Sequence, residues 1–167
     1  MKRDLQTPTG DEPPTATLAP RAELDFYDRA LAELSAALTA LEAWNLMMAA
    51  PQPLMRLAFR IRDAISSRFG VRRIGGFSGR RRETVAEGER LDFFLVERAA
   101  PDLLVLTERD RHLDVMTTIS TAGRWIAITS SVVTHNRFGR VYMLPVGPAH
   151  RIIVRRMLRR LRRRLAG

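Results

Sequence analysis

The sequence of 167 residues contains no cysteine and no long apolar run. Without cysteine, the chain can form neither a disulfide framework nor a thiolate metal site. No stretch reaches about 18 uncharged apolar residues, so no transmembrane helix is expected. The first twenty residues lack the apolar core of a secretory signal, so none is expected there. These absences predict a cytoplasmic protein.

Lysine is nearly absent as well, because Lys2 is the only one among 28 basic residues. We interpret this arginine usage as coding bias in a GC-rich bacterium. The formal net charge is +10, and residues 155–167 carry seven arginines and no acid. Without those seven charges the net charge falls to about +3, an ordinary value for a soluble domain. The excess positive charge therefore belongs to the C-terminal segment.

Proline, threonine and glycine are concentrated at the N-terminus, where no hydrophobic period occurs. Residues 1–21 are therefore predicted to form a flexible arm. Residues 22–167 are predicted to form a single domain, because the length and the apolar content of 46% suit one hydrophobic core.

Local patterns predict two helices early in the chain. Thr39 and Glu42 have the spacing of a capping box, which predicts a helix near residues 40–49. Two prolines after residue 50 end it, and apolar residues then recur at helical spacing from residue 54 to residue 69, just before a glycine. The earlier segment ELDFYDRALAEL (23–34) is ambiguous, because its aromatic residues favour a short strand and its alanines and leucines a helix.

Apolar runs after residue 90 predict antiparallel strands, which are LDFFLVER, DLLVLTER, HLDVMTTIS and RWIAITSSVVTH. After Asn136, a suitable helix N-cap, the hydrophobic period becomes helical. Proline and glycine between residues 145 and 148 predict a short helix near 137–144, a kink, and a long helix from Pro148 to about residue 164. The core-facing stripe of this long helix is Ile153, Val154, Met157, Leu158, Leu161 and Leu165. The predicted fold class is α+β, an antiparallel sheet packed around a long C-terminal helix.

The last two predicted strands form a hairpin with Ala122 and Gly123 as its turn. In that register Val115 lies opposite Ser130, and side chains alternate between the two faces. One face is predicted to be core and carries Leu113, Val115, Thr117, Ile119, Ile126, Ile128 and Val132. The other face carries His112, Asp114, Met116, Trp125 and Ser131, with Asp110 and His135 opposite each other at its open end.

Two interpretations of this polar cluster stay open. A solvated sheet face commonly carries histidine, aspartate and serine. Alternatively, a His–Asp pair lines the mouth of a pocket, where histidine gains or loses a proton near neutral pH. On the second interpretation His112, Asp114 and His135 are candidate catalytic residues.

Familiar cofactor and nucleophile motifs are missing from the sequence. The segment IGGFSG (74–79) lacks the spacing of a phosphate-binding loop and is interpreted as a plain connector. No serine lies in a GxSxG nucleophile elbow. The three histidines lack tight ligand spacing, so no metal site and no cofactor are predicted.

Two segments, ERDRHLDVMTT and VVTHNRFGRVYMLPVGPAHRIIVRRML, resemble an uncharacterised bacterial domain-of-unknown-function family. The residues that carry the resemblance are Gly139, Arg140, Tyr142, Pro148, His150, Arg156 and Met157. It covers about residues 24–160 and is most specific at the C-terminal end. Some members of that family follow a short-chain-dehydrogenase-like domain, which this sequence lacks.

That family is in turn similar to the START/Bet v 1-like (SRPBCC) superfamily, which includes polyketide cyclases and lipid carriers. The resemblance implies a helix-grip-like fold, in which an antiparallel sheet curls around the C-terminal helix and a ligand binds between them. The superfamily has six strands, whereas the sequence here shows four clear ones after the early helices. The sheet is therefore expected to be abbreviated.

Three functions follow as hypotheses. The first is binding of a hydrophobic small molecule, with ordinary core packing as the alternative role of each candidate lining residue, namely Phe94, Met116, Trp125, Tyr142, Met143 and His150. The second is a cyclase- or hydratase-like enzyme in the same cavity. The third is association of the C-terminal arginines with anionic lipid or nucleic acid. The third is disfavoured because no aromatic residues are interleaved with the arginines, whose stems commonly cover the apolar flank of a helix.

Overall fold

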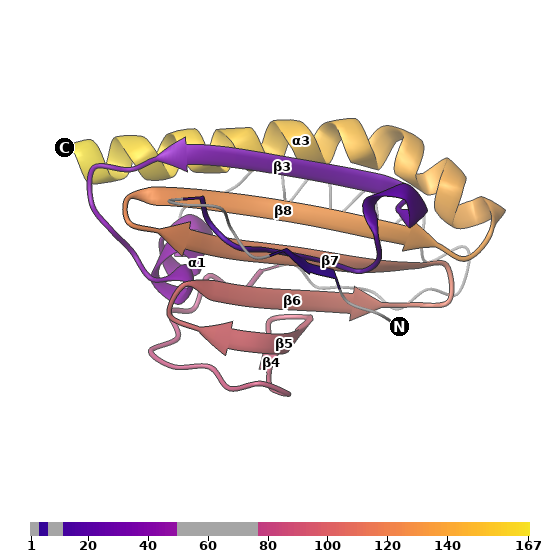
Figure 1. Cartoon of the computed structure of the whole chain (residues 1–167), viewed down its shortest axis with the longest axis horizontal. Helices are drawn as coiled ribbons and strands as arrows, with labels where there is room; N and C mark the ends of the chain where they lie inside the picture. The colour runs from indigo at the N-terminus through magenta and orange to yellow at the C-terminus, as the bar shows by residue number, and fades with distance from the viewer. Residues whose placement is uncertain (1–3, 7–11, 50–76) are drawn as a thin grey trace.

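The computed structural model describes residues 4–6, 12–49 and 77–167, which form an α+β fold. Six antiparallel strands form one sheet in the order β3-β8-β7-β6-β5-β4, and the long helix α3 (Arg137–Ala166) lies along one face. Figure 1 shows α3 running beside β3 and β8 for the length of the sheet. The predicted fold class is confirmed. The strands are β3 (Phe26–Glu33), β4 (Arg90–Leu91), β5 (Phe94–Ala100), β6 (Leu103–Arg109), β7 (Leu113–Ala122) and β8 (Trp125–Thr134).

The hairpin of β7 and β8 differs from the predicted one by one residue in its turn. Ala122 pairs with Trp125, so Gly123 and Arg124 form the turn, and Val115 lies opposite Val132 rather than opposite Ser130. Gly123 has φ of 54°, a left-handed conformation that glycine adopts far more readily than alanine. The shift moves each partner by two residues, so the predicted division of side chains between the two faces is unchanged.

The ambiguous early segment is the strand β3, which pairs with β8 about a hundred residues later in the chain. Its alternate residues Phe26, Asp28 and Ala30 are buried, whereas Leu31 is exposed. This period of two matches a strand with one face against a core. Together with the short β4, β3 completes a sheet of six strands instead of the abbreviated one that was expected.

The first predicted helix is confirmed as α1 (Ala40–Ala49), with its capping box in place. The Thr39 amide donates to Glu42 Oε2 at 2.8 Å, and the Glu42 amide donates to Thr39 Oγ1 at 3.2 Å. These reciprocal bonds satisfy two backbone donors that a helix leaves free at its N-terminus. The helix predicted between residues 54 and 69 lies outside the described residues.

The break predicted in the C-terminal helix does not occur, because α3 continues through Pro145 and Pro148. Each proline removes one backbone hydrogen bond, to the carbonyl four residues earlier. Those carbonyls belong to Val141 and Leu144, whose side chains are 64% and 73% exposed, so they lie on a side that water reaches. The loss of these hydrogen bonds bends α3 near its N-terminal end and does not interrupt it (Figure 1). Asn136 caps the helix as predicted, since its Oδ1 accepts a hydrogen bond from the Gly139 amide at 3.0 Å.

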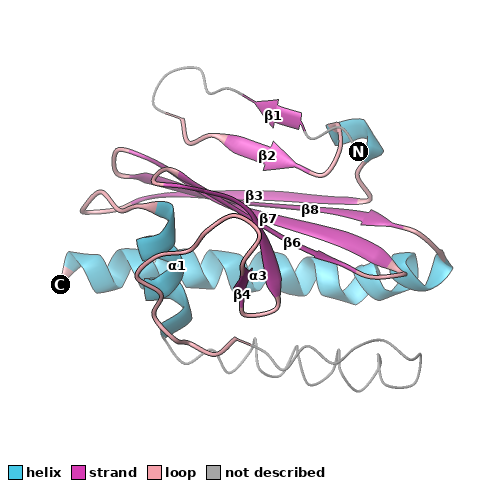
Figure 2. Cartoon of the chain, turned by 90° about the horizontal axis from the view of Figure 1, so that it is seen from below, coloured by secondary structure: helices cyan, strands magenta, loops and turns pink. Residues whose placement is uncertain are grey.

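The sheet separates two hydrophobic clusters. The larger lies between the sheet and the helices α1 and α3, and it includes most of the predicted stripe of α3. The smaller lies on the opposite face, where β2 (Thr15–Thr17) crosses the strands and pairs with β1 (Asp4–Gln6). Figure 2 shows these layers, with β1 and β2 on one side of the sheet and both helices on the other. A short 3₁₀ helix, η1 (Arg21–Glu23), leads from β2 to β3.

Part of the segment predicted to be a flexible arm therefore packs against the sheet. Leu18 is fully buried, and its neighbours in the smaller cluster include Val105 and Met116. The Leu18 amide also donates to Ser131 Oγ at 3.1 Å, and Thr118 Oγ1 donates to the Ala16 carbonyl at 2.9 Å. These apolar and polar contacts offset the conformational entropy lost when the segment is ordered. No helix of the described residues is long and apolar enough to cross a membrane.

Candidate ligand-binding cavity

A cavity of about 270 Å³ lies between the helix-facing side of the sheet and the helices α1 and α3. Most of the described side chains around it are apolar. From the strands they include Phe26, Phe94, Leu113, Val115, Ile119, Ile128 and Val132. From the helices they include Trp44, Met47, Met48, Phe138, Tyr142, Met143, Val146, Ala149, Ile153, Val154 and Met157.

Strand alternation and one close helix contact position this lining. Odd-numbered residues of β7 and even-numbered residues of β8 face the helices, because they are cross-strand partners on one side of the sheet. At Gly147, a Cβ atom would lie 3.0 Å from Cε2 of Phe26. The missing side chain lets α3 approach β3 closely beside the cavity.

A polar cluster interrupts the apolar lining where β7, β8 and α3 meet. Thr117 and Ser130 are cross-strand partners, and their hydroxyl oxygens lie 3.4 Å apart. Nε2 of His150 lies 2.9 Å from Oγ of Ser130. Burial lowers the pKa of His150, an effect that Asp28 opposes and that Arg151 and Arg155 reinforce. The folded protein therefore favours the neutral imidazole in this cluster.

Asp28 lies next to this cluster, because it is the partner of Ser130 on β3. Its Oδ1 lies 3.3 Å from Nη2 of Arg155 and 3.5 Å from Nε of Arg151. Its Oδ2 is buried without a hydrogen-bond partner in the described part of the chain. The fold thus gathers a serine, a histidine and an aspartate, but the hydrogen bond joins only Ser130 to His150, and the carboxylate pairs with arginines.

A second polar group lies at the end of the cavity near the start of α3, where His112 contacts the ring of Phe138 at a centroid distance of 4.5 Å. Arg111 Nε donates to His112 Nε2 at 2.9 Å, so that nitrogen acts as the acceptor. The other ring nitrogen, Nδ1, lies beside the side-chain amide of Asn136, 3.0 Å from its Nδ2 and 3.3 Å from its Oδ1. A Cβ atom on Gly139 would lie 2.4 Å from the His112 carbonyl oxygen, so glycine is required for this approach.

The structure separates the three predicted catalytic residues. His112 lines the cavity, whereas Asp114 and His135 pair on the opposite face, with 3.1 Å between Asp114 Oδ1 and His135 Nε2. His112 precedes β7, and Oδ1 of Asp110 accepts hydrogen bonds from the amides of His112 and Leu113 at 2.7 and 3.0 Å. This turn takes His112 out of the strand alternation on which the prediction rested. Asp110 and His135 are not opposite each other, because the His135 amide donates to the His112 carbonyl.

Four of the six predicted ligand-binding residues line the cavity, namely Phe94, Tyr142, Met143 and His150. The other two do not. Met116 is fully buried in the cluster on the opposite face, and Trp125 is 41% exposed at the end of the hairpin. Both belong to the face that carries Asp114, as the hairpin pattern predicts, and the helices lie on the other face.

The sequence-based interpretation did not select Thr117 and Ser130 as site residues. Thr117 was assigned to the core face, and Ser130 lies on the same face by the same alternation. The signal was a pair of hydroxyl side chains among valines and isoleucines on a face predicted to be core. Buried polar groups require hydrogen-bond partners, so such a pair on a core face indicates a polar site.

Comparisons with known proteins identify a family and no specific relative. No curated protein and no solved structure matches the chain. The wider START/Bet v 1-like resemblance is not confirmed by these comparisons. A family model described as a protein of unknown function (DUF2867) matches residues 21–157, which span the sheet from β3 to β8 and the part of α3 that lines the cavity. The chain therefore belongs to the DUF2867 family.

Proposed function

We propose that this protein binds a small, mostly apolar molecule in the cavity between the sheet and α3. Ligand pockets in proteins are typically apolar clefts with a few placed polar groups that orient the ligand. The cavity here has that composition, with the cluster of Thr117, Ser130 and His150 on its sheet side. At about 270 Å³ the cavity is slightly smaller than the usual range of about 300–1,000 Å³, which favours a compact ligand.

The observation that carries this proposal is the polar cluster on a core face. A purely structural core has no need of hydroxyl groups at Thr117 and Ser130, because apolar side chains fill a core without the hydrogen-bond partners that a buried hydroxyl group requires. These hydroxyls and the imidazole border the cavity, a volume that the side chains of the described residues leave open. They offer hydrogen bonds to one polar group of a bound molecule, whose apolar part contacts the surrounding rings and aliphatic groups.

The test is displacement of anilinonaphthalene sulfonate, a fluorescent apolar probe, by octanol. We expect the folded protein to bind the probe and octanol to displace it. Ala149 lines the cavity, so Ala149→Phe fills it and should weaken octanol binding by about tenfold or more. The matched control is Val141→Phe, which adds a ring at an exposed position of the same helix and should bind as the wild type does. Equal octanol affinity in both variants would contradict the proposal.

A second candidate function, a cyclase- or hydratase-like enzyme in the same cavity, is favoured by the state of His150. A neutral imidazole held 2.9 Å from a hydroxyl group can accept a proton, as a general base must. Any molecule found to occupy the cavity would be incubated with the protein at equal concentration and followed by mass spectrometry. Enzyme action predicts a product that wild type forms and His150→Gln does not, while the variant still binds. If the molecule is recovered unchanged after incubation with the wild type, the enzyme hypothesis is excluded and only the binding function remains.

A further inference from the structure

The strand β3 forms the outer edge of the sheet in the part of the chain that the structure describes. Within the described residues β3 pairs with β8 only, so its other side carries backbone groups with no strand beside them. In an antiparallel pair, the backbone amide and carbonyl groups of successive residues point alternately toward the neighbouring strand and away from it. The Leu34 amide donates to the Arg124 carbonyl, so the backbone groups of the even-numbered residues of β3 point toward β8. The amide and carbonyl groups of Arg29, Leu31 and Glu33 therefore point away from the sheet. Edges of this kind template the addition of another strand unless they are blocked.

One edge carbonyl already has a partner from α3. Arg151 Nη2 donates to the Tyr27 carbonyl at 3.4 Å, which shows that arginines of α3 reach this edge. Beyond Tyr27, a groove of about 420 Å³ separates β3 from α3. Ala30, Ala32 and Leu158 contribute small or apolar side chains to it, and Leu31 at the edge is 44% exposed.

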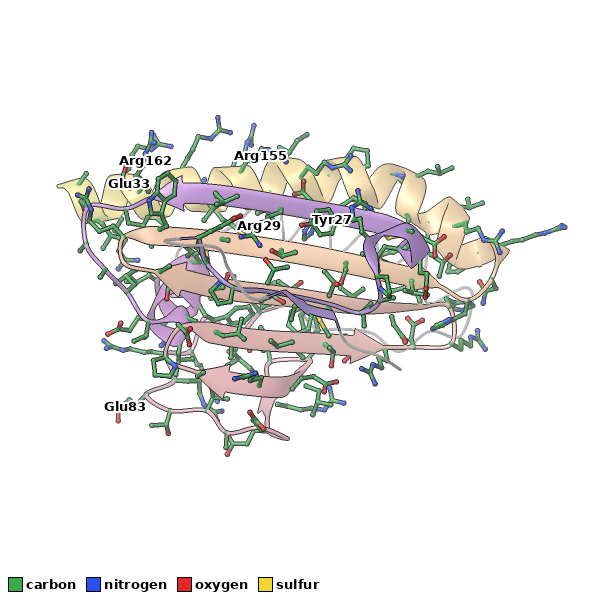
Figure 3. All side chains as sticks on the ribbon, viewed as in Figure 1. Tyr27, Arg29, Glu33, Glu83, Arg155 and Arg162 are labelled. Atoms are coloured by element: carbon green, nitrogen blue, oxygen red, sulfur yellow. The ribbon has the colours of Figure 1, made fainter. Side chains whose placement is uncertain are left out.

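The helix side of the groove is positively charged. Arg155, Arg159 and Arg162 line it, at spacings of four and three residues that place them on one flank of α3. Figure 3 labels Arg155 and Arg162 on the side of α3 beyond the outer edge of β3. Arg155 shares the carboxylate of Asp28 with Arg151, whereas Arg159 and Arg162 form no ion pair with any described residue.

The nearby acidic side chains do not neutralise this row of arginines. Glu33 pairs with Arg124 at the end of the hairpin. Glu12 pairs with Arg29, whose guanidinium also donates to the Pro13 carbonyl at 2.8 Å, on the β2 side of the sheet. As far as the described residues show, the groove thus combines backbone donors and acceptors without a strand partner, an exposed leucine and unpaired positive charge.

We propose that this groove binds an extended acidic segment of a partner protein, which adds to the sheet as a strand beside β3. Main-chain hydrogen bonds to β3 supply affinity in strand addition, and alternate side chains supply specificity. In an added strand every second side chain faces the helix side of the sheet. Acidic residues at those positions would meet Arg155, Arg159 and Arg162.

A second copy of this chain fits the groove less well. Pairing two β3 strands would continue the sheet through both copies and place both α3 helices on the same face. Arg159 and Arg162 of one copy would then approach those of the other, and like charges that face each other oppose association. An acidic partner removes that repulsion and compensates the charge.

The experiment uses fluorescence anisotropy with a labelled peptide of about ten residues in which glutamate and valine alternate. We expect the full-length protein to bind it. Arg159→Gln with Arg162→Gln should weaken binding roughly tenfold. The matched control is Arg156→Gln with Arg163→Gln, which removes the same charge from exposed positions that do not line the groove and should change affinity less than about twofold. A peptide with proline in place of every valine keeps the charge but loses every second amide donor and fixes φ at about −65°, which disfavours a strand ladder, so it should bind much more weakly.

Three results would overturn the proposal. The first is absence of binding by the glutamate–valine peptide, and the second is an equal loss in the two double variants. The third is equal binding of the proline peptide, because charge alone would then account for the association. A single-stranded oligonucleotide and vesicles containing phosphatidylglycerol are measured in parallel. Tighter binding of either one, lost in Arg159→Gln with Arg162→Gln, would assign the arginines to phosphate recognition instead.

Discussion

The three histidines of this chain have different environments, although two of them are close in sequence to the same hairpin. His112 contacts Phe138 at one end of the cavity, His135 pairs with Asp114 on the opposite face, and His150 lies beside Ser130 in the cavity. Burial lowers the pKa of His150, so the fold opposes its protonation. Its charge state therefore links cavity chemistry to stability.

We expect the free energy of unfolding to fall as the pH drops below about 6.5, the ordinary pKa of histidine. The folded pKa lies below the unfolded one, so the unfolded chain binds a proton that the folded protein resists. The stability linked to neutral His150 is fully present above the pKa of histidine in the unfolded chain. It is lost as the pH falls through the lower pKa of His150 in the folded protein. Urea unfolding between about pH 8 and about pH 5 would measure this, and His150→Gln should lose less stability over that interval.

The control for the pH experiment is Val141→Gln, which places the same amide side chain at an exposed position of α3 and removes no titratable group. It should keep the pH dependence of the wild type. Parallel curves for wild type and His150→Gln would show that His150 does not carry the effect.

At the scale of elements, the ends of the helices follow rules that act within one turn. The capping box of α1 and the Asn136 cap of α3 are both present where the sequence predicts them. The predicted interruption of α3 is absent, because packing of its buried stripe against the sheet outweighs two lost hydrogen bonds.

Thr39→Ala should lower the free energy of unfolding by about 0.5–2 kcal/mol, because it leaves an N-terminal amide of α1 without its acceptor. Chemical denaturation at neutral pH measures this change. Thr84→Ala is the matched control, because it makes the same substitution at an exposed position of the loop before β4, and it should have almost no effect. A loss as large in Thr84→Ala as in Thr39→Ala would contradict a capping role.

The same capping interaction has its own pH dependence. Hydrogen bonds from the Thr39 amide and hydroxyl lower the pKa of Glu42. The stability that Glu42 contributes is therefore present above its ordinary pKa of 4.5 and is lost as the pH falls through the lower folded value. Thr39→Ala should thus lose less stability than the wild type in strong acid.

At the scale of the whole molecule, the sheet has two covered faces. The helices cover one face and enclose the cavity, and β2 with Leu18 covers part of the other. The N-terminal segment thereby shields apolar residues such as Met116 and Val105 from water. It belongs to the folded unit through these contacts.

Leu18→Ala should reduce the free energy of unfolding by about 2–5 kcal/mol, the usual cost of truncating a fully buried leucine. Leu144→Ala is the matched control, since Leu144 is 73% exposed on α3, and its effect should be close to zero. Thermal and urea unfolding measure both. Unchanged stability in Leu18→Ala would mean that the segment contributes no packing to the folded state.

The sequence alone determined the features that depend on neighbours a few residues apart. These are the two caps, the apolar stripe of α3, the hairpin and the division of its side chains between two faces, because backbone geometry repeats over short spacings. Tertiary structure decided what local spacing does not encode. It paired β3 with β8, brought Ser130 and Asp28 next to His150, and turned His112 away from Asp114. Those outcomes depend on which elements cover each face of the sheet, and that choice is made by long-range packing of apolar surface.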